Sequence, residues 1–407
     1  MKILVISDYG APAGGAEQYT FNLISGLKAA GHSVRLFSGD LTVRGMSCLA
    51  DYTFPGYDQA SRWLKLTRGI YNAMAVRALR HAIDDFRPDV IHLQMFLQQC
   101  SPSILGELRG IPTFVTIHEY RLFCPIGTKF IMDTEQICVN EPGCDCVANK
   151  CVNWAGLAAY SLQRSQVKKY LGKINQWLPP SSYAEARLRA FGVSNIARLP
   201  YGFDPARLPF MPPSVREPTK QVLYLGRLDV AKGVKILVKT FVEVIKQVPE
   251  AKLLIVGQGS VRSWIENEIS KKGLENNITL HDWVPADKIA ELHHGSAVLA
   301  APSIWPDNLP LVICEAMFLG TPVLATNVGG VPDIVENGVT GRLVRPHDHG
   351  EMAMACIEML KNVKNTNDIS INARKIVGGM LDMGQHIERL SDIYAAIGQS
   401  VLIIKEK

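Results

Sequence analysis

The chain lacks long hydrophobic runs. Nowhere in its 407 residues do uncharged apolar positions approach the length of about 18 that a membrane-spanning helix needs. The apolar run at the N-terminus stops at Asp8, too early for the hydrophobic region of a signal peptide. We therefore expect a cytoplasmic protein.

Acidic residues are absent from two N-terminal segments, 59–83 and 152–184. Residues 1–205 hold 21 Lys and Arg against 16 Asp and Glu, whereas residues 206–407 hold 22 of each, so the first half carries the net charge of +5. Between 63 and 83 apolar residues recur every three or four positions, which predicts one basic amphipathic helix. Such a helix either packs on its own domain or makes a peripheral contact with an anionic membrane or an acidic acceptor.

The length favours two or three domains. Short apolar runs alternate with helical patterns, which predicts parallel sheets covered by helices on both faces. A Pro-rich stretch, 200–218, separates two such series. The first series has strands at 2–7, 33–38, 89–93 and 112–117 and a helix at 16–30; the second has strands at 221–226, 252–256, 278–281, 297–300 and 322–326, with helices near 234–247, 261–272, 286–293 and 309–320. We expect two Rossmann-like, doubly wound α/β domains, residues 1–205 and 206–385, that face each other across a cleft.

Ligands of such sheets bind at the carboxyl ends of the strands. After the first strand, Gly14 and Gly15 open a helix, where backbone N–H groups either approach an anion or simply make a tight turn. After the strand at 221–226, Arg227 and Lys232 suit a diphosphate. Gly257 and Val284 also follow strands, and either they line a binding site for a nucleotide base or they form simple turns.

The segment 303–317, SIWPDNLPLVICEAM, places two acids, Asp307 and Glu315, in an apolar setting. Asn308 is a suitable N-cap and Pro310 fits a first turn, so we expect a helix from about 309 to 320. A carboxylate in this setting needs hydrogen-bond donors. Either sugar hydroxyls of a ligand supply them, or Glu315 forms an ion pair with Arg227 or Lys232.

The motifs GGAE, YLGRLDVAKGV and PSIWPDNLPLVICEAMFLGTPVLATNVGGVPDIVENGVTG together resemble the retaining nucleotide-sugar glycosyltransferases of family four, which are glycogen-synthase-like and have the GT-B fold. The resemblance runs from Met1 to about Met359. It implies that Arg227 and Lys232 bind the donor diphosphate, Glu315 the ribose and Asp307 the transferred sugar. The family has Glu where this chain has Asp307, one methylene shorter. The amides of Asn308, Leu309 and Leu311 are expected to face the phosphates.

The segment HEYRLFCP, 118–125, resembles part of the same family, which implies that His118 contacts the C6 hydroxyl of the donor sugar or stabilises the transition state. Tyr201 stands where the interdomain motif usually has Asn. The fold implies that a last helix, about 386–407, crosses back to the first domain.

The resemblance implies a retaining hexosyltransferase. We expect UDP-glucose as its donor and a glycan or a lipid-linked molecule as its acceptor. No nucleic-acid partner is expected. No Asp-x-Asp motif occurs in the chain. This fits a metal-independent enzyme in which basic side chains take the place of a divalent metal ion at the diphosphate. Two alternatives remain: a glycoside hydrolase that uses Asp307 and Glu315 as its acid pair, and a nucleotide-sugar-binding partner protein without catalysis.

Five of the nine cysteines fall within 28 residues. Their spacing leaves open a structural zinc site, a labile disulfide or reduced thiols. They are Cys124, Cys138, Cys144, Cys146 and Cys151.

Overall fold

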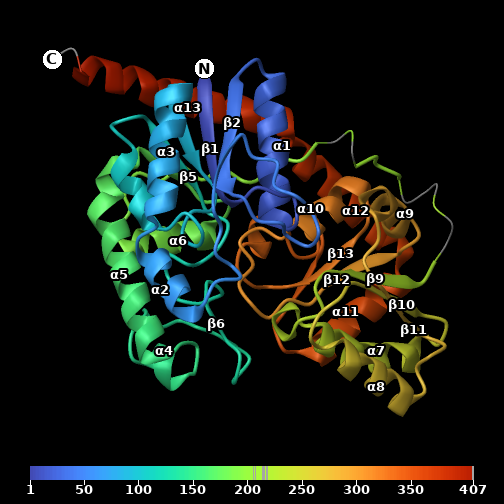
Figure 1. Ribbon diagram of the computed structural model, residues 1–407. Helices are drawn as coiled ribbons and strands as arrows, with labels where there is room; N and C mark the ends of the chain where they lie inside the picture. The colour runs from blue at the N-terminus through green and yellow to red at the C-terminus, as the bar shows by residue number, and fades with distance from the viewer. Residues whose placement is uncertain (205, 207, 213–215, 217–218, 406–407) are drawn as a thin grey trace. The chain divides into compact units, whose positions relative to one another are not determined.

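The computed structural model describes residues 1–204, 206, 208–212, 216 and 219–405, with side chains up to residue 397. It contains two compact units (Figure 1). The N-terminal unit comprises Met1–Lys129, Val139–Phe203 and Met383–Lys407, and the C-terminal unit comprises Phe130–Cys138 and Asp204–Asp382. Residues 406 and 407, which we expected in the last helix, and parts of the Pro-rich stretch lie outside the described residues.

The N-terminal unit is built on a parallel six-stranded sheet in the order β3-β2-β1-β4-β5-β8. This is the strand order of a Rossmann fold. The strands are β1 (Lys2–Tyr9), β2 (Ser33–Gly39), β3 (Tyr52–Phe54), β4 (Val90–Leu93), β5 (Thr113–Thr116) and β8 (Gln176–Leu178), and the main helices are α1 (Gly15–Ala29), α2 (Arg62–Ile70), α3 (Ala73–Phe86), α5 (Trp154–Tyr170), α6 (Ser182–Phe191) and α13 (Met383–Lys405). Ile3 pairs with Val34 on one side of β1 and with Val90 on the other.

The basic segment expected as one helix forms two, so this prediction was wrong. Tyr71, between α2 and α3, has an extended backbone (φ −142°, ψ 113°). Asn72 is fully buried, and its side chain accepts hydrogen bonds from the amides of Met74 and Ala75. A buried N-cap therefore interrupts a pattern that is continuous in hydropathy.

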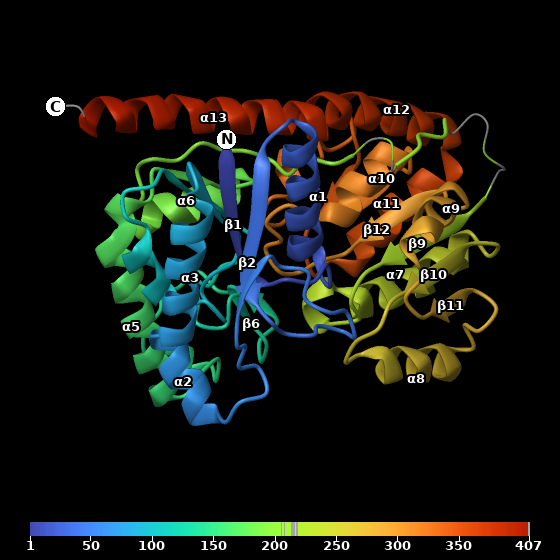
Figure 2. The same ribbon diagram turned by 45° about the horizontal axis from the view of Figure 1, so that its top comes forward.

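The last helix, α13, belongs to the N-terminal unit and passes along it above β1 and β2 (Figure 2). The Tyr19 hydroxyl on α1 lies 2.8 Å from His386 Nε2. The Tyr394 hydroxyl lies 2.6 Å from Nδ1 of His92, whose Nε2 lies 2.8 Å from Thr116 Oγ1. Buried polar contacts thus fix α13 to α1 and to two strands.

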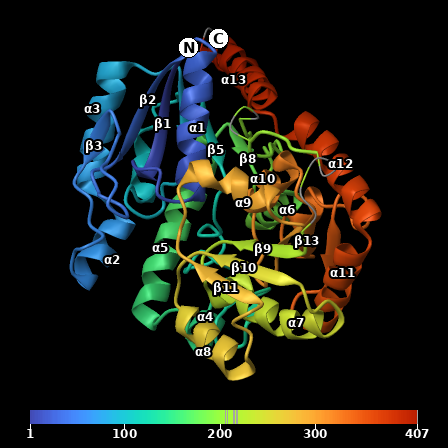
Figure 3. The ribbon, with the colours of Figure 1, turned by 90° about the vertical axis from the view of Figure 1, so that its right-hand side faces the viewer.

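The C-terminal unit repeats the architecture with the order β11-β10-β9-β12-β13-β14, again parallel. In Figure 3, β9, β10 and β11 run side by side, with α7 and α8 on one side of them. The strands are β9 (Gln221–Leu225), β10 (Lys252–Val256), β11 (Ile278–His281), β12 (Val298–Ala301), β13 (Val323–Thr326) and β14 (Arg342–Val344), and the helices are α7 (Val234–Gln247), α8 (Arg262–Lys272), α9 (Ile289–His294), α10 (Leu311–Leu319), α11 (His349–Lys361) and α12 (Val363–Met380).

Each sheet has its own apolar core. Ile91, Val115 and Trp177 are buried in the N-terminal unit, and Val222, Ile255 and Val298 in the C-terminal unit. Because both faces of each sheet are covered, the central strands read as continuous apolar runs. Polar residues gather instead beyond the strand ends.

Candidate functional site

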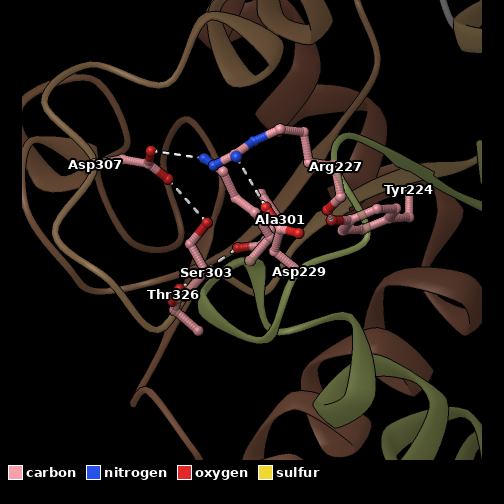
Figure 4. Close-up of polar contacts among 8 residues, drawn as sticks. Tyr224, Arg227, Asp229, Ala301, Ser303, Asp307 and Thr326 are labelled. Atoms are coloured by element: carbon pink, nitrogen blue, oxygen red, sulfur yellow. Dashed lines mark hydrogen bonds and ion pairs between the residues drawn. The ribbon is translucent and has the colours of Figure 1, made fainter. Parts of the chain in front are cut away.

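In the parallel sheet of the C-terminal unit, the order in which the strands follow one another along the chain reverses between β9 and β12. Open α/β sheets bind ligands outside the carboxyl ends of the strands at such a point. Arg227 and Lys232 follow β9, and Asp307 follows β12, so the structure brings these predicted residues to one place (Figure 4).

Each of the two cations has an acidic neighbour. Lys232 Nζ lies 2.7 Å from Asp307 Oδ1, and the two side chains are 23% and 10% exposed. Arg227 Nη1 lies 2.9 Å from Asp229 Oδ2. The Lys232 ammonium also lies 4.9 Å from the centre of the Trp305 ring, a cation–π contact. The pairs orient both cations while leaving them accessible.

The loop that carries Lys232 is packed against the loop after β12. Gly233 has φ +71°, and a Cβ there would lie 1.8 Å from the Pro302 carbonyl oxygen. The amide of Ile304 donates to the Ala231 carbonyl at 2.9 Å. Only glycine allows this approach, so Gly233 fixes the position of Lys232.

Asp307 is held from two sides. The Ser303 hydroxyl donates to Asp307 Oδ2 at 2.8 Å, and the Thr326 hydroxyl donates to the Ser303 carbonyl. The Gly330 amide donates to the Asp307 carbonyl at 2.7 Å, and a Cβ on Gly329 (φ +55°) would lie 2.2 Å from that carbonyl oxygen. The Gly-Gly pair of the sequence motif thus supports the Asp307 backbone.

Helix α10 begins at Leu311, so Asn308 is not its N-cap as we expected. Pro310 occupies the cap position with an extended backbone (φ −72°, ψ 109°), and a residue before proline, here Leu309, is disfavoured in helical conformation. Asn308 is 8% exposed, and neither atom of its side-chain amide has a hydrogen-bond partner in the described structure. Its amide is therefore available to a ligand.

Glu315 lies on α10 and is partly exposed. In the described part of the chain its carboxylate makes neither a hydrogen bond nor an ion pair, because Lys232 pairs with Asp307 and Arg227 with Asp229. The ion-pair alternative for Glu315 is therefore wrong. Desolvation raises its pKa from 4.5 to about 7.

Gly257 and Val284 lie in neighbouring loops at the end of β10 and beyond β11. The Gly257 amide donates to the His281 carbonyl at 3.0 Å. Asp282 accepts from Arg262 Nη1 at 3.0 Å, which ties the loop before Val284 to α8. The two predicted residues thus share one edge of the unit.

In the N-terminal unit, Gly14 is the N-cap of α1 and has an extended backbone. A Cβ on Gly14 would lie 2.5 Å from Glu17 Oε2. The protein's own carboxylate thus stands beside this helix start, and burial raises the pKa of Glu17.

His118 follows β5, and its surroundings fix both its orientation and its charge. Its Nε2 lies 2.7 Å from Gln94 Oε1. Tyr201 stacks on the ring with centroids 5.1 Å apart, and the Tyr201 hydroxyl donates to the Ile117 carbonyl at 2.8 Å. Burial lowers the pKa of His118 to about 3, so the ring is neutral at physiological pH and Nε2–H donates to Gln94. Sequence reasoning missed Gln94, although it directly follows β4.

Two further acids, to which the sequence analysis assigned no role, lie at this edge of the N-terminal sheet. Asp8 is fully buried and accepts hydrogen bonds from the amides of Gln98 and Cys100, and burial raises its pKa to about 6. Glu119 forms an ion pair with Arg121 at 3.2 Å, and burial raises its pKa to about 7. The Glu119 side chain is 28% exposed and can accept hydrogen bonds from hydroxyl groups, whereas both oxygens of the buried Asp8 carboxylate already accept from backbone amides.

The sequence left zinc, a disulfide and reduced thiols open for the cysteine cluster, and in the described structure none of the five cysteines is part of a disulfide. Among the described residues no group of three or more His, Cys, Asp or Glu side chains is arranged to hold a metal ion. Cys124 is buried, whereas Cys144 is exposed. The structure therefore does not assemble the five cysteines into a zinc site.

Known families match both units. The family described as Glycosyltransferase Family 4 matches residues 13–207, and the family described as Glycosyl transferases group 1 matches residues 211–376. The chain belongs to the GT-B glycosyltransferases of family 4. The two matches cover His118 in one unit and Arg227, Lys232, Asp307 and Glu315 in the other.

Curated relatives of this glycosyltransferase include a glycogen synthase of Mycobacterium tuberculosis, 25% identical over 88% of the chain and 86% of that protein. An alpha-D-kanosaminyltransferase of Streptomyces kanamyceticus is 28% identical over 44% of the chain and 46% of that protein. An uncharacterized glycosyltransferase of Methanocaldococcus jannaschii is 29% identical over 40% of the chain. The chain spans less than half the length of the latter two relatives.

Solved GT-B structures share the fold. Sucrose-phosphate synthase of Thermosynechococcus elongatus superposes with a TM-score of 0.76 at 20% identity, over 98% of this chain and all of that one. HepE of Anabaena, in complex with UDP and glucose, superposes with a TM-score of 0.69 at 17% identity, over 97% and 99% of the two chains. The comparisons favour neither a glycoside hydrolase nor a non-catalytic partner protein. Within the described residues no helix of this glycosyltransferase combines the length and apolar character needed to cross a membrane.

Proposed function

We propose that this glycosyltransferase transfers a hexose, glucose from UDP-glucose, to a glycan or lipid-linked acceptor in polysaccharide biosynthesis. The anomeric configuration is retained. The enzyme works in the cytoplasm, with its basic N-terminal unit in peripheral contact with the inner face of the membrane.

The observation that carries the proposal is the unpartnered carboxylate of Glu315. It lies on α10, the helix that follows β12 at the strand-order reversal, and desolvation raises its pKa to about 7. A ribose diol supplies two hydroxyl donors, which would favour the ionised carboxylate. A ligand with a diphosphate next to a ribose therefore satisfies Glu315 and both cations together.

In the reaction, the bond between the sugar C1 and the diphosphate oxygen breaks, and the acceptor oxygen bonds to C1 on the same face. The acceptor proton passes to the departing phosphate oxygen. Arg227, Lys232 and the amides of Asn308, Leu309 and Leu311 stabilise the negative charge that develops on the diphosphate, without a divalent ion. The Asp307 carboxylate already accepts from Lys232 and Ser303, and its remaining lone pairs accept from hydroxyls of the transferred hexose.

The remaining predicted residues take positioning roles. Gly257 and Val284 line the site of the nucleotide base, and Gly14 and Gly15 bring backbone amides toward the donor. His118 contacts the C6 hydroxyl of the hexose. A neutral ring whose Nε2–H is engaged by Gln94 offers Nδ1 as an acceptor for that hydroxyl.

UDP and glucose are favoured as the donor parts because HepE binds them in a structure of the same fold, and because a relative of similar length is a glycogen synthase. The polyhydroxylated acceptor is proposed because of the polar edge of the N-terminal unit. The part-exposed carboxylate of Glu119 there suits hydroxyl groups.

The test is a thermal-shift panel with UDP, GDP and ADP and their sugars, followed by nucleotide release with a panel of acceptors. A ligand at 100 times its Kd stabilises by about 2.7 kcal/mol. We expect UDP and UDP-glucose to stabilise most, UDP release to require an acceptor, and the product to keep the α configuration by NMR. Failure of every nucleotide to stabilise the protein, or hydrolysis of an aryl glycoside in its place, would refute the proposal.

A further inference from the structure

A cavity of about 450 Å³ lies in the N-terminal unit, beyond the ends of β2 and β3 and beside α2. Its volume is in the range of pockets that hold small molecules. Two of the residues that line it are Asp40, which directly follows β2, and Gly56, which lies two residues after β3. The cavity therefore lies at the edge of the sheet where open α/β folds bind ligands.

Arg68 brings a positive charge to this cavity. Leu64 and Arg68 are four residues apart on α2, so they share one side of the helix, and both line the cavity. In the described part of the chain Arg68 forms neither an ion pair nor a hydrogen bond, and the segment 59–83 contains no acid. The donors of its planar guanidinium are therefore available to an anion.

Tyr57 gives the cavity a fixed aromatic surface. The residue is 7% exposed, its amide donates to Gln99 Oε1 at 2.9 Å, and its hydroxyl donates to the Gln98 carbonyl. The Arg68 guanidinium lies 5.9 Å from the centre of the Tyr57 ring. This cation–π contact orients the guanidinium without occupying its hydrogen-bond donors.

Asp40 supplies a hydrogen-bond acceptor to the same cavity. The Gly56 amide donates to Asp40 Oδ1 at 2.8 Å, whereas Oδ2 accepts no hydrogen bond from any described residue. Asp40 and Arg68 both line the cavity, yet in the described structure they form no ion pair with each other. A ligand that satisfies both presents hydrogen-bond donors to Asp40 and a negative charge to Arg68. Leu41 and Leu64 add apolar contact surface, which suits the C–H groups of a sugar ring.

We propose that this cavity binds an acidic sugar unit of the acceptor, a hexose that carries a carboxylate or a phosphate group. The anionic group pairs with the Arg68 guanidinium in bidentate geometry, and the sugar hydroxyls donate to Asp40 Oδ2. A neutral hexose would leave Arg68 without a partner, and inorganic phosphate would leave Asp40 and the apolar side chains unused. The identity of the ligand as the acceptor rests on the proposed function, whereas its binding requires no donor.

The experiment is titration calorimetry of the full chain, without donor, with methyl glucoside, methyl glucuronide, glucose 6-phosphate and inorganic phosphate. We expect an acidic sugar to bind about tenfold or more tightly than the neutral glucoside and inorganic phosphate, and the tighter acidic sugar identifies the anionic group. Arg68→Gln should weaken the binding of this sugar roughly 10- to 100-fold and leave methyl glucoside unchanged, because only the contact between charges is lost. Asp40→Asn, which keeps an acceptor for the Gly56 amide, should weaken the binding of methyl glucoside severalfold.

UDP release links this binding to the acceptor. With UDP-glucose as donor, oligosaccharides that contain the acidic unit should support faster UDP release than neutral ones. Arg68→Gln should raise their KM without changing kcat, because the contact lies away from the reacting atoms and is the same in the ground and transition states.

Matched controls lie elsewhere on the N-terminal unit. Arg77→Gln removes an exposed arginine of α3. Asp89→Asn removes the charge of an exposed aspartate that, like Asp40, accepts one backbone amide, here from Lys2 at 2.7 Å. Both should bind the acidic sugar like the unmodified protein, and all four variants should keep its circular dichroism and its Tm shift with UDP-glucose.

The Tm shift with UDP-glucose tests the donor assignment separately. If UDP-glucose causes no shift while the acidic sugar binds through Arg68, the proposed function fails and the binding site stands. A normal shift with equal binding of acidic and neutral sugars would overturn the cavity assignment alone. So would equal weakening by Arg68→Gln and Arg77→Gln, or inorganic phosphate that binds through Arg68 as tightly as the acidic sugars. Equal UDP release with acidic and neutral oligosaccharides would overturn the identity of the ligand as the acceptor.

Discussion

Replacing Glu315 with Gln should stabilise the unliganded enzyme at alkaline pH. The pKa of Glu315 is 4.5 in its ordinary state and about 7 in the folded protein. Because the unfolded chain loses this proton first, stability falls as pH rises from about 4.5 to 7, and the full cost applies above pH 7. A shift of this size corresponds to about 3 kcal/mol.

Gln keeps the shape of the side chain but never ionises. At pH 8 the variant should therefore gain about 3 kcal/mol, or roughly 6–12 °C in Tm for a unit of this size, and near pH 5 the gain should fall to about 1 kcal/mol. The assay is thermal unfolding of both proteins between pH 5 and 8.5. Glu275→Gln, an exposed glutamate of the same unit, is the control and should change little at any pH.

The same substitution should weaken donor binding. Hydrogen bonds to a charged group contribute about 1.5–3 kcal/mol each, so losing the charge under two hydroxyls should raise the Kd for UDP-glucose roughly 100-fold or more. In the unmodified enzyme, binding should also release a proton near pH 7, visible by calorimetry in buffers of different ionisation enthalpy. A Glu315→Gln variant with unchanged pH stability and unchanged donor affinity would refute the reasoning.

Three further substitutions address the neighbouring residues. Lys232→Ala should lower kcat/KM roughly 100- to 1000-fold by removing a stabiliser of the leaving group, and in the unmodified enzyme EDTA should have no effect; inhibition by EDTA would contradict the role given to the cations. Gly329→Ala should lower donor affinity as well as Tm, because the new Cβ collides with the Asp307 carbonyl, whereas Gly273→Ala, with a similar φ of +63° and open space, should lower Tm alone. His118→Ala should reduce kcat without changing the shape of the pH profile between 5 and 8, because the pKa of His118 is about 3; loss of an ionisation in that range would count against a neutral ring.

Hydropathy predicted the central strands well and the edges poorly. The runs at 2–7 and 252–256 are buried on both faces and correspond to β1 and β10. The strands β3, β8 and β14 were missed, because each has three residues at the edge of its sheet. A run this short carries no readable period.

Some features of the candidate site could also be predicted from the sequence, and others could not. The rule that ligands lie beyond strand ends predicted the meeting of Arg227, Lys232 and Asp307, and the same rule applied to β4 would have found Gln94. It did not reveal that Lys232 pairs with Asp307, because the pair joins residues 75 apart whose distance depends on the packing of Gly233 against Pro302. Local cap preference also misled at Asn308, since a buried amide without partners has no local signature.

The two acids of the 303–317 segment show why the site is costly without its ligand. Asp307 is stabilised by Lys232 and Ser303, whereas Glu315 and the amide of Asn308 have polar atoms without a partner in the described structure. Such groups destabilise a fold by about 1–3 kcal/mol each, so selection for stability alone would remove them. Both residues lie at or just before α10, in the segment that follows β12 at the strand-order reversal, and under the proposed function their hydrogen-bond partners arrive with the donor. UDP-glucose should therefore raise the Tm of the unmodified enzyme by more than it raises the Tm of the Glu315→Gln or the Asn308→Leu variant.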